Sequence, residues 1–144
     1  MADLLQICIV GAGPAGLSAA ARAAAQGLRY VLLEASPAIA KTIQDYQKGK
    51  HVMAEPGVLP LRSDLKFDVG TREQVLGSWQ SGLQGLGVNV QYGAEVKSID
   101  GGKGAFELKL KNGGLVRAQH VVLGIGLQGN PRTLGVPGEE PSCV

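Results

Sequence analysis

A glycine-rich turn and one acidic residue are the strongest chemical signal in the sequence. The turn reads "GAGPAG", from Gly11 to Gly16, and Glu34 follows 23 residues after Gly11. In such a turn the first glycine permits a tight bend, the second lets a pyrophosphate approach the backbone, and the third lets a helix pack on a strand. An acidic residue about 20 positions later accepts hydrogen bonds from ribose hydroxyls. These residue types at this spacing therefore predict a dinucleotide site.

The elements around this turn have the order that such a site requires. Leu4 to Val10 is an apolar run broken only by Gln6, typical of a strand covered on both faces of a parallel sheet. Pro14 suits the first position of a helix, and Gly27 is a typical residue after its end. Arg29 to Ala35 is a second apolar run that ends beside Glu34. The pattern predicts a strand, helix and strand at the start of a doubly wound α/β sheet.

The acid also narrows the class of nucleotide. A carboxylate at Glu34 accepts hydrogen bonds from both ribose hydroxyls but repels a 2′-phosphate, which favours FAD or NAD over NADP. Periodicity does not choose between FAD and NAD. The structural alternative is a glycine-rich turn that binds no ligand.

The middle of the chain is predicted to hold a long connection, a helix and a third strand. Residues 36–70 show no clear period and are too long for an idle connection, so they are expected to be functional or disordered. Thr71 and Gln74 form a capping-box pattern at the start of a helix, in which Trp79 is expected to be a core residue. Val88 to Tyr92 reads as a short strand.

The remaining pattern is that of an antiparallel meander. Phe106, Leu108 and Leu110 alternate with charged residues, and the "NGG" at Asn112 is a strong hairpin signal. Val121 to Ile125 is apolar enough to rejoin the main sheet. The predicted fold is α/β: a Rossmann-like doubly wound parallel sheet with an inserted antiparallel β-meander.

Composition limits the function classes. The 144 residues fit one domain, with 44% hydrophobic and 18% charged residues and a net charge of +2, so nucleic acid is not an expected partner. No apolar stretch reaches the length of a membrane span, and the start lacks a basic signal region, so we expect a cytoplasmic protein without a membrane partner. Cys8 and Cys143 lie far apart, and no residue spacing indicates a metal site.

Two longer stretches carry a family resemblance. "ICIVGAGPAGLSAAARAAAQGLRYVLLEA" at Ile7 to Ala35 and "VVLGIGLQGNPRTLGVPGEE" at Val121 to Glu140 together resemble the two-dinucleotide-binding-domain flavoproteins. The resemblance is to the thioredoxin-reductase-like branch of the pyridine nucleotide-disulfide oxidoreductases. It implies a three-layer FAD/NAD(P)-binding fold in which the first glycine motif binds FAD. It also implies that NAD(P)H binds through a domain not present in this chain.

The resemblance implies a set of cofactor-binding residues but no catalytic ones. Glycine-turn residues match the pyrophosphate site, the acid and its neighbour match the ribose site, and a later valine offers backbone groups to the adenine. Lysine and threonine in the long connection are expected to contact phosphate or flavin, and two later glycines belong to the second motif, although Gly124 and Ile125 stand where Ala and Thr are usual. The expected residues are Gly11, Gly13, Pro14, Ala15, Gly16, Glu34, Ala35, Lys41, Thr42, Val96, Gly124 and Gly126.

The long connection holds three further candidates under this resemblance. Tyr46, His51 and Met53 would lie close to the flavin ring, where the protein's contribution is positioning and electronic tuning. For His51 a solvated loop position is the simpler interpretation.

The predicted function is that of the N-terminal FAD-binding part of an FAD-dependent, NAD(P)H-using oxidoreductase. The expected segments are a dinucleotide-binding unit at 1–35, a loop near the flavin at 36–70, a helix and strand at 71–92, a meander at 93–120, and a return strand at 121–144 that leads toward the absent NAD(P)H domain. One alternative is an NAD-binding Rossmann dehydrogenase. The other is a non-catalytic dinucleotide-binding or self-associating module, which would form a homodimer through an exposed sheet edge.

Overall fold

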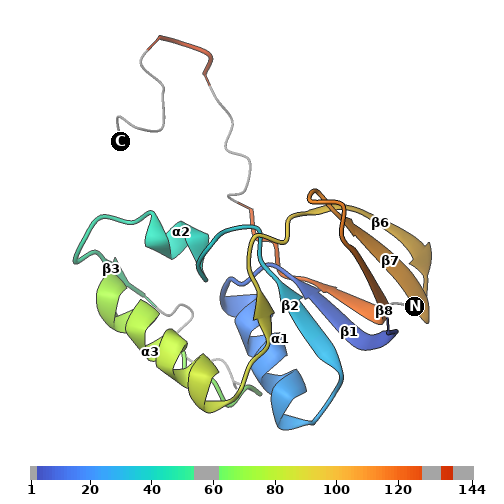
Figure 1. The fold of residues 1–144 in the computed structure, drawn as a ribbon. Coiled ribbons are helices and arrows are strands. Elements are labelled where there is room, and N and C mark those ends of the chain that lie inside the picture. The colour runs from blue at the N-terminus through green and yellow to red at the C-terminus, as the bar shows by residue number, and fades with distance from the viewer. Residues whose placement is uncertain (1–2, 54–61, 128–133, 138–144) are drawn as a thin grey trace.

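The computed structural model describes residues 3–53, 62–127 and 134–137, and its centre is a six-stranded sheet (Figure 1). The strand order is β5-β2-β1-β8-β7-β6, and a separate two-stranded sheet pairs β3 with β4. The elements are β1 (Leu5–Val10), α1 (Pro14–Ala25), β2 (Tyr30–Leu33), α2 (Lys41–Gln44), β3 (His51–Val52), β4 (Gly70–Thr71), α3 (Arg72–Gly85), β5 (Val90–Gln91), β6 (Val96–Gly102), β7 (Ala105–Leu110) and β8 (Leu115–Leu123).

The parallel half of the sheet has β1 at its centre. β1 pairs in parallel with β2 on one side and with β8 on the other, and β5 extends β2 in parallel. Cys8 and Ile9 are both fully buried although they point to opposite faces, because both faces of β1 are covered. The predicted strand–helix–strand unit is thus present, and the glycine turn follows the carboxyl-terminal end of β1.

Strand β8 joins the parallel half to the meander. Its first residues pair antiparallel with β7 and its later residues pair parallel with β1, so that Ala118 faces both Phe106 and Leu5. The sequence predicted that the chain returns from the hairpin and that the end of this stretch rejoins the main sheet. In the structure one continuous nine-residue strand does both.

Helices and meander cover opposite faces of the parallel strands, which gives three layers. On one face, α1 and α3 bury a core that includes Leu17, Leu32 and Trp79. On the other face, Leu33 of β2 and Leu108 of β7 belong to a second core. Burial in this second core raises the pKa of the Cys8 thiol to about 12. The predicted α/β fold with its inserted meander is confirmed.

The residues predicted to begin and end the helices are confirmed as well. Pro14 stands at the first turn of α1, and Gly27 follows the helix with a φ of 65°. At α3 the Thr71 hydroxyl accepts the Gln74 N–H, and the Gln74 side chain accepts the Thr71 N–H, which completes the capping box.

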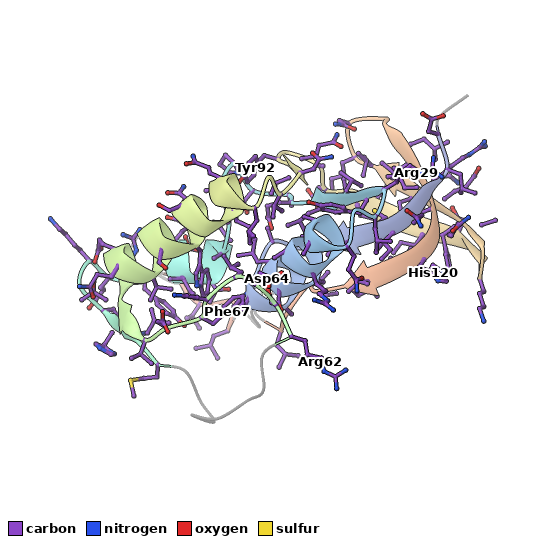
Figure 2. The ribbon with its side chains drawn as sticks, turned by 90° about the horizontal axis from the view of Figure 1, so that it is seen from below. Arg29, Arg62, Asp64, Phe67, Tyr92 and His120 are labelled. Carbon is purple, nitrogen blue, oxygen red and sulfur yellow. The ribbon has the colours of Figure 1, made fainter. Side chains whose placement is uncertain are left out.

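Trp79 is buried as predicted, and its partner comes from the long connection. Phe67, labelled in Figure 2, packs edge-on against the Trp79 ring with 5.2 Å between the ring centroids. Leu65 is buried in the same core. Within the described ranges, no helix combines the length and apolar character needed to cross a membrane.

Candidate dinucleotide site

The glycine turn connects β1 to the amino-terminal end of α1. Gly11 N–H donates to the Leu33 carbonyl at 2.8 Å, which ties the turn to β2. The Leu17 N–H is the first of the helix to bond back, to the Gly13 carbonyl at 2.9 Å. The N–H groups of Ala15 and Gly16 therefore precede the first helical bond and are available to an anion, supported by the positive end of the helix dipole.

The three glycines of the motif lack side chains for different reasons. A Cβ on Gly16 would lie 1.8 Å from the Gly11 carbonyl oxygen, and a Cβ on Gly11, whose φ is +96°, would lie 2.5 Å from the Gly124 carbonyl oxygen. A Cβ on Gly13 would come no closer than 3.9 Å to another part of the chain, and the Gly13 backbone, with φ −78° and ψ −178°, suits any residue. Packing requires Gly11 and Gly16, but no contact among the described residues requires Gly13. The cradle at Gly13 fits a pyrophosphate that approaches the backbone.

Glu34 lies directly beside this turn and is 92% buried, with 8% of its surface exposed. One carboxylate oxygen accepts the Ala12 N–H at 2.7 Å, and the other accepts the Ser36 N–H at 2.8 Å. A carboxylate has about four acceptor positions, so each oxygen keeps one for a further donor. The two backbone bonds fix the carboxylate, and its remaining acceptor positions can take hydrogen bonds from hydroxyl donors.

The segment after β5 forms a wall beside Glu34. The Ala94 N–H donates to the Glu34 carbonyl at 2.8 Å. The pKa of the exposed Tyr92 is raised, first by partial burial and then by the negative charge of Glu34. Val96 follows two residues after Ala94, half-buried at the start of β6. The sequence pattern identified Val96 through the family resemblance but did not single out Tyr92.

The second glycine motif meets the first at the end of β8. The Gly124 N–H donates to the Val10 carbonyl at 2.7 Å, and a Cβ on Gly124 would lie 3.0 Å from the Gly16 nitrogen. This close approach accounts for glycine at a position where the family resemblance leads one to expect alanine. Gly126 lies two residues further on, exposed and with a φ of 64°.

The long connection also returns to the turn. Ala40 N–H donates to the Ala12 carbonyl at 2.8 Å, which places α2 beside the glycine motif. Lys41 and Thr42 are exposed on α2, and the Lys41 ammonium forms an ion pair with Asp45. Pro14, Ala15 and Ala35 are exposed as well.

The other candidates of the connection lie on its outer part. The Lys50 ammonium stacks over the ring of Tyr46 at 4.0 Å, while His51 and Met53 are exposed. Contact of these side chains with a flavin stays a prediction.

Ala40 is the one described residue other than glycine with a positive φ, at 51°. A Cβ in this left-handed region costs about 1–2 kcal/mol, and glycine costs about 0.5–1 kcal/mol in extra unfolded-chain entropy. Loss of the buried Ala40 methyl group costs about 0.8 kcal/mol, so we expect Ala40→Gly to leave the free energy of unfolding within about 1 kcal/mol of wild type in urea titrations. Ala38→Gly is the matched control and should lower it, because no positive φ is relieved there. If Ala40→Gly lost as much stability as the Ala38→Gly control, the result would contradict the backbone strain assigned to Ala40.

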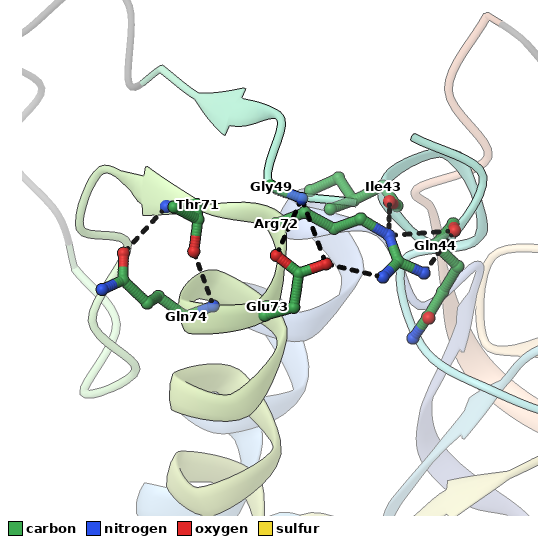
Figure 3. A network of polar contacts seen from close by, with 7 residues as sticks. All are labelled: Ile43, Gln44, Gly49, Thr71, Arg72, Glu73 and Gln74. Carbon is green, nitrogen blue, oxygen red and sulfur yellow. Dashed lines mark hydrogen bonds and ion pairs between the residues drawn. The ribbon is translucent and has the colours of Figure 1, made fainter. Parts of the chain in front are cut away.

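A polar network binds α2, the following loop and α3 together (Figure 3). The Arg72 guanidinium donates from Nε and Nη2 to the carbonyl oxygens at the end of α2, and from Nη1 to Glu73 at 3.0 Å. Glu73 in turn accepts the Gly49 N–H at 3.1 Å. The pKa of Glu73 is lowered, first by its own backbone N–H and then by Arg72.

This lowered pKa predicts a pH-dependent contribution to stability. A carboxyl whose pKa is lower in the folded state stabilises the fold above its ordinary value of 4.5, and the contribution disappears as the pH falls through the folded value. We expect Glu73→Gln to be less stable than wild type at pH 7, with the difference shrinking toward pH 3. Urea unfolding at both pH values measures it, and a difference that stays constant would refute the assignment.

Other chemically interesting groups lie apart from the turn. His120 is exposed on β8, where it pairs with Ile7, and Figure 2 shows it well separated from Tyr92. A shallow cavity of about 600 Å³ is lined by residues that include Leu4, Phe106 and Arg117. None of the residues that line this cavity belongs to the glycine turn.

Comparison with known proteins agrees with this geometry. Among curated proteins, the chain is 29% identical over 138 residues to the indole-3-pyruvate monooxygenase YUCCA1 of Oryza sativa subsp. japonica, an alignment that covers 90% of this chain and 34% of that protein. Among solved structures, bacillithiol disulfide reductase of Bacillus cereus superposes with a TM-score of 0.76 at 25% identity, over 96% of this chain and 44% of the other.

Thioredoxin reductase of Lactococcus lactis shares the fold as well, with a TM-score of 0.71 and 22% identity over 94% of this chain and 39% of the other. The chain thus spans between a third and a half of the length of these relatives. The family model described as pyridine nucleotide-disulphide oxidoreductase matches residues 8–144. On the strength of this match over nearly its whole length, the chain belongs to the pyridine nucleotide-disulphide oxidoreductase family.

Proposed function

We propose that this chain holds the adenosine and pyrophosphate half of FAD in an FAD-dependent oxidoreductase that uses NAD(P)H. The family and its flavin-dependent relatives support FAD as the cofactor and oxidoreduction as the general chemistry, in agreement with the prediction. The use of NAD(P)H, and the status of this chain as one portion of a longer enzyme, are parts of the proposal. The share of the relatives that it spans supports the second part.

The observation that carries the proposal is the empty space at Gly13. Gly11 and Gly16 are explained by contacts within the chain, whereas a Cβ on Gly13 would have no close neighbour. A glycine without a packing reason, at the amino-terminal end of a helix and beside a buried carboxylate, fits close approach of a phosphate to the backbone.

Each expected residue then has a defined task. The N–H groups of Ala15 and Gly16 bind the pyrophosphate. Pro14 begins the helix at a position where its missing N–H costs no helical hydrogen bond. Glu34 accepts the ribose hydroxyls, and the backbone of Val96 contacts the adenine. The rest of the cofactor is bordered by five further residues: Ala35, Lys41, Thr42, Gly124 and Gly126.

The protein's own contribution at this half of the cofactor is binding and orientation. When bound, FAD supplies the electron-accepting flavin that takes a hydride from a reduced nicotinamide. The fixed Glu34 carboxylate and the helix N–H groups hold the distant adenosine end, so that the flavin is delivered to one position.

We expect Glu34→Gln to weaken ADP binding by about tenfold or more, because a hydrogen bond to a charged group contributes about 1.5–3 kcal/mol. Wild type should also prefer ADP to adenosine 2′,5′-diphosphate, and the variant should lose much of this preference. Isothermal titration calorimetry measures both affinities.

Glu107→Gln is the control for this experiment, because Glu107 pairs with Arg117 in the meander and takes no part in the turn. It should bind ADP as wild type does. Unchanged ADP affinity in a folded Glu34→Gln variant would contradict the ribose role. Tighter binding of NADH than of FAD by wild type would favour the NAD-binding dehydrogenase instead.

A further inference from the structure

The residue that begins α3 controls the position of α2 from outside the dinucleotide site. We propose that Arg72 is a positioning residue for FAD: its guanidinium holds the segment Ile39–Gln44 against the glycine turn, so that the second half of the dinucleotide meets a preformed surface. This inference rests on the proposed function. It adds a residue that touches no part of the cofactor.

The contacts of Arg72 converge on the carboxyl-terminal end of α2 (Figure 3). Its Nε donates to the Ile43 carbonyl at 3.2 Å and to the Gln44 carbonyl at 3.1 Å, and its Nη2 donates to the Gln44 carbonyl at 2.6 Å. The Ile43 carbonyl also accepts a hydrogen bond from the Tyr46 N–H at 3.1 Å, and a cation at the carboxyl-terminal end of a helix is favourable. With 24% of its side chain exposed, Arg72 is held mostly out of solvent.

The guanidinium is itself held in place by its surroundings. The Glu73 carboxylate accepts a hydrogen bond from the third guanidinium nitrogen, Nη1, at 3.0 Å, and it accepts another from the Gly49 N–H. The Arg72 backbone N–H donates to the Lys50 carbonyl at 2.7 Å. The loop between α2 and β3 is thus closed onto α3 from both sides of the arginine.

The other end of the same segment is attached to the glycine turn. The Ala40 N–H donates to the Ala12 carbonyl, and the side chains of Ile39 and Ile43 are buried in the core under α1. The segment therefore spans from the turn to Arg72, with Lys41 and Thr42 exposed between the two anchors.

The position of this segment determines which half of the cofactor it affects. With the adenosine at Glu34 and the pyrophosphate at Gly13, the second half of a dinucleotide extends beyond the turn, where Ala40 and Gly124 are the neighbours. ADP needs only the turn and Glu34, so its affinity is independent of Arg72. The extra affinity of FAD over ADP depends on α2 being in place before binding, since preorganisation reduces the cost of ordering.

The test compares FAD and ADP binding in wild type and Arg72→Lys, by titration calorimetry on the 144-residue chain. Lysine keeps the charge but cannot donate in a planar fork to two carbonyls. ADP affinity should stay within about twofold of wild type, while the ratio of FAD to ADP affinity falls by about tenfold or more. Arg22→Lys, an exposed site in the last turn of α1, is the control and should leave both affinities unchanged.

Hydrogen exchange supplies a readout that needs no ligand. The amides of Ile43, Gln44 and Asp45 should exchange at least about tenfold faster in Arg72→Lys, while the Gly11 and Ala12 amides keep their wild-type rates. The inference is overturned if Arg72→Lys weakens ADP and FAD binding equally. It is also overturned if the ratio of FAD to ADP affinity and the amide exchange rates both stay unchanged. Neither result affects the proposed function. A wild-type chain that binds neither nucleotide overturns the proposed function and this inference with it.

Discussion

Replacing Gly16 with alanine is expected to lower the free energy of unfolding by about 3 kcal/mol or more. The added Cβ would lie 1.8 Å from the oxygen and 3.0 Å from the carbon of the Gly11 carbonyl. Both are backbone atoms at the centre of the turn, so relief requires α1 to move away from β1. Forcing extra atoms into such a packed site costs about 1–3 kcal/mol in most proteins, and more where the backbone must move.

Gly77→Ala is the matched control for this prediction. Gly77 is also a helical glycine, but it is exposed in α3 and a Cβ there would have no neighbour within 4 Å. Alanine should raise stability by about 0.5–1 kcal/mol at this position, because glycine weakens a helix interior. Urea unfolding of both variants gives the comparison. Wild-type stability in Gly16→Ala would show that the turn does not have the described geometry.

Gly13→Ala is expected to separate binding from folding. Its Cβ would lie 3.9 Å from the Gly124 carbonyl oxygen, in a backbone conformation that alanine adopts readily, so stability should stay within about 1 kcal/mol of wild type. The same methyl group occupies the space assigned to a phosphate. Loss of two charge-assisted hydrogen bonds from the helix N–H groups would weaken ADP binding by about 100-fold.

The two glycine variants give opposite results if each glycine has its assigned role. Gly16→Ala should unfold easily, whereas Gly13→Ala should stay folded and lose ADP, as measured by calorimetry at equal protein concentrations. Gly77→Ala should bind ADP as wild type does. A folded Gly13→Ala variant with wild-type affinity would show that phosphate does not approach the backbone there.

The parts of the fold that depend on local pattern could be predicted from sequence. The glycine turn, the start of α1 at Pro14 and the capping box at Thr71 each rest on residues close together in the chain, and the structure has all three. Trp79 followed from helical periodicity for the same reason. The fold class and the family were confirmed, while FAD rather than NAD came only from the family resemblance.

The parts that depend on distant contacts could not be predicted. Arg72 bonds to carbonyls 28 and 29 residues away, and nothing in its neighbouring sequence indicates them. Ala40 takes a left-handed conformation that its residue type does not suggest. The helix α2 has only four residues, too few to show a period. Tyr92 lies between Gln91 and Ala94, which both bond to the Glu34 backbone, and only the folded sheet creates these contacts.

Displacement of FAD by its own halves is the most direct test of the adenosine and pyrophosphate site. Wild-type chain is loaded with FAD and challenged with ADP or with FMN at equal concentrations, and the FAD that stays bound is separated from free nucleotide and quantified by chromatography. The proposed site predicts that ADP displaces FAD and that FMN does not, because the turn and Glu34 recognise the adenosine diphosphate portion. Displacement by FMN with no effect of ADP would contradict it.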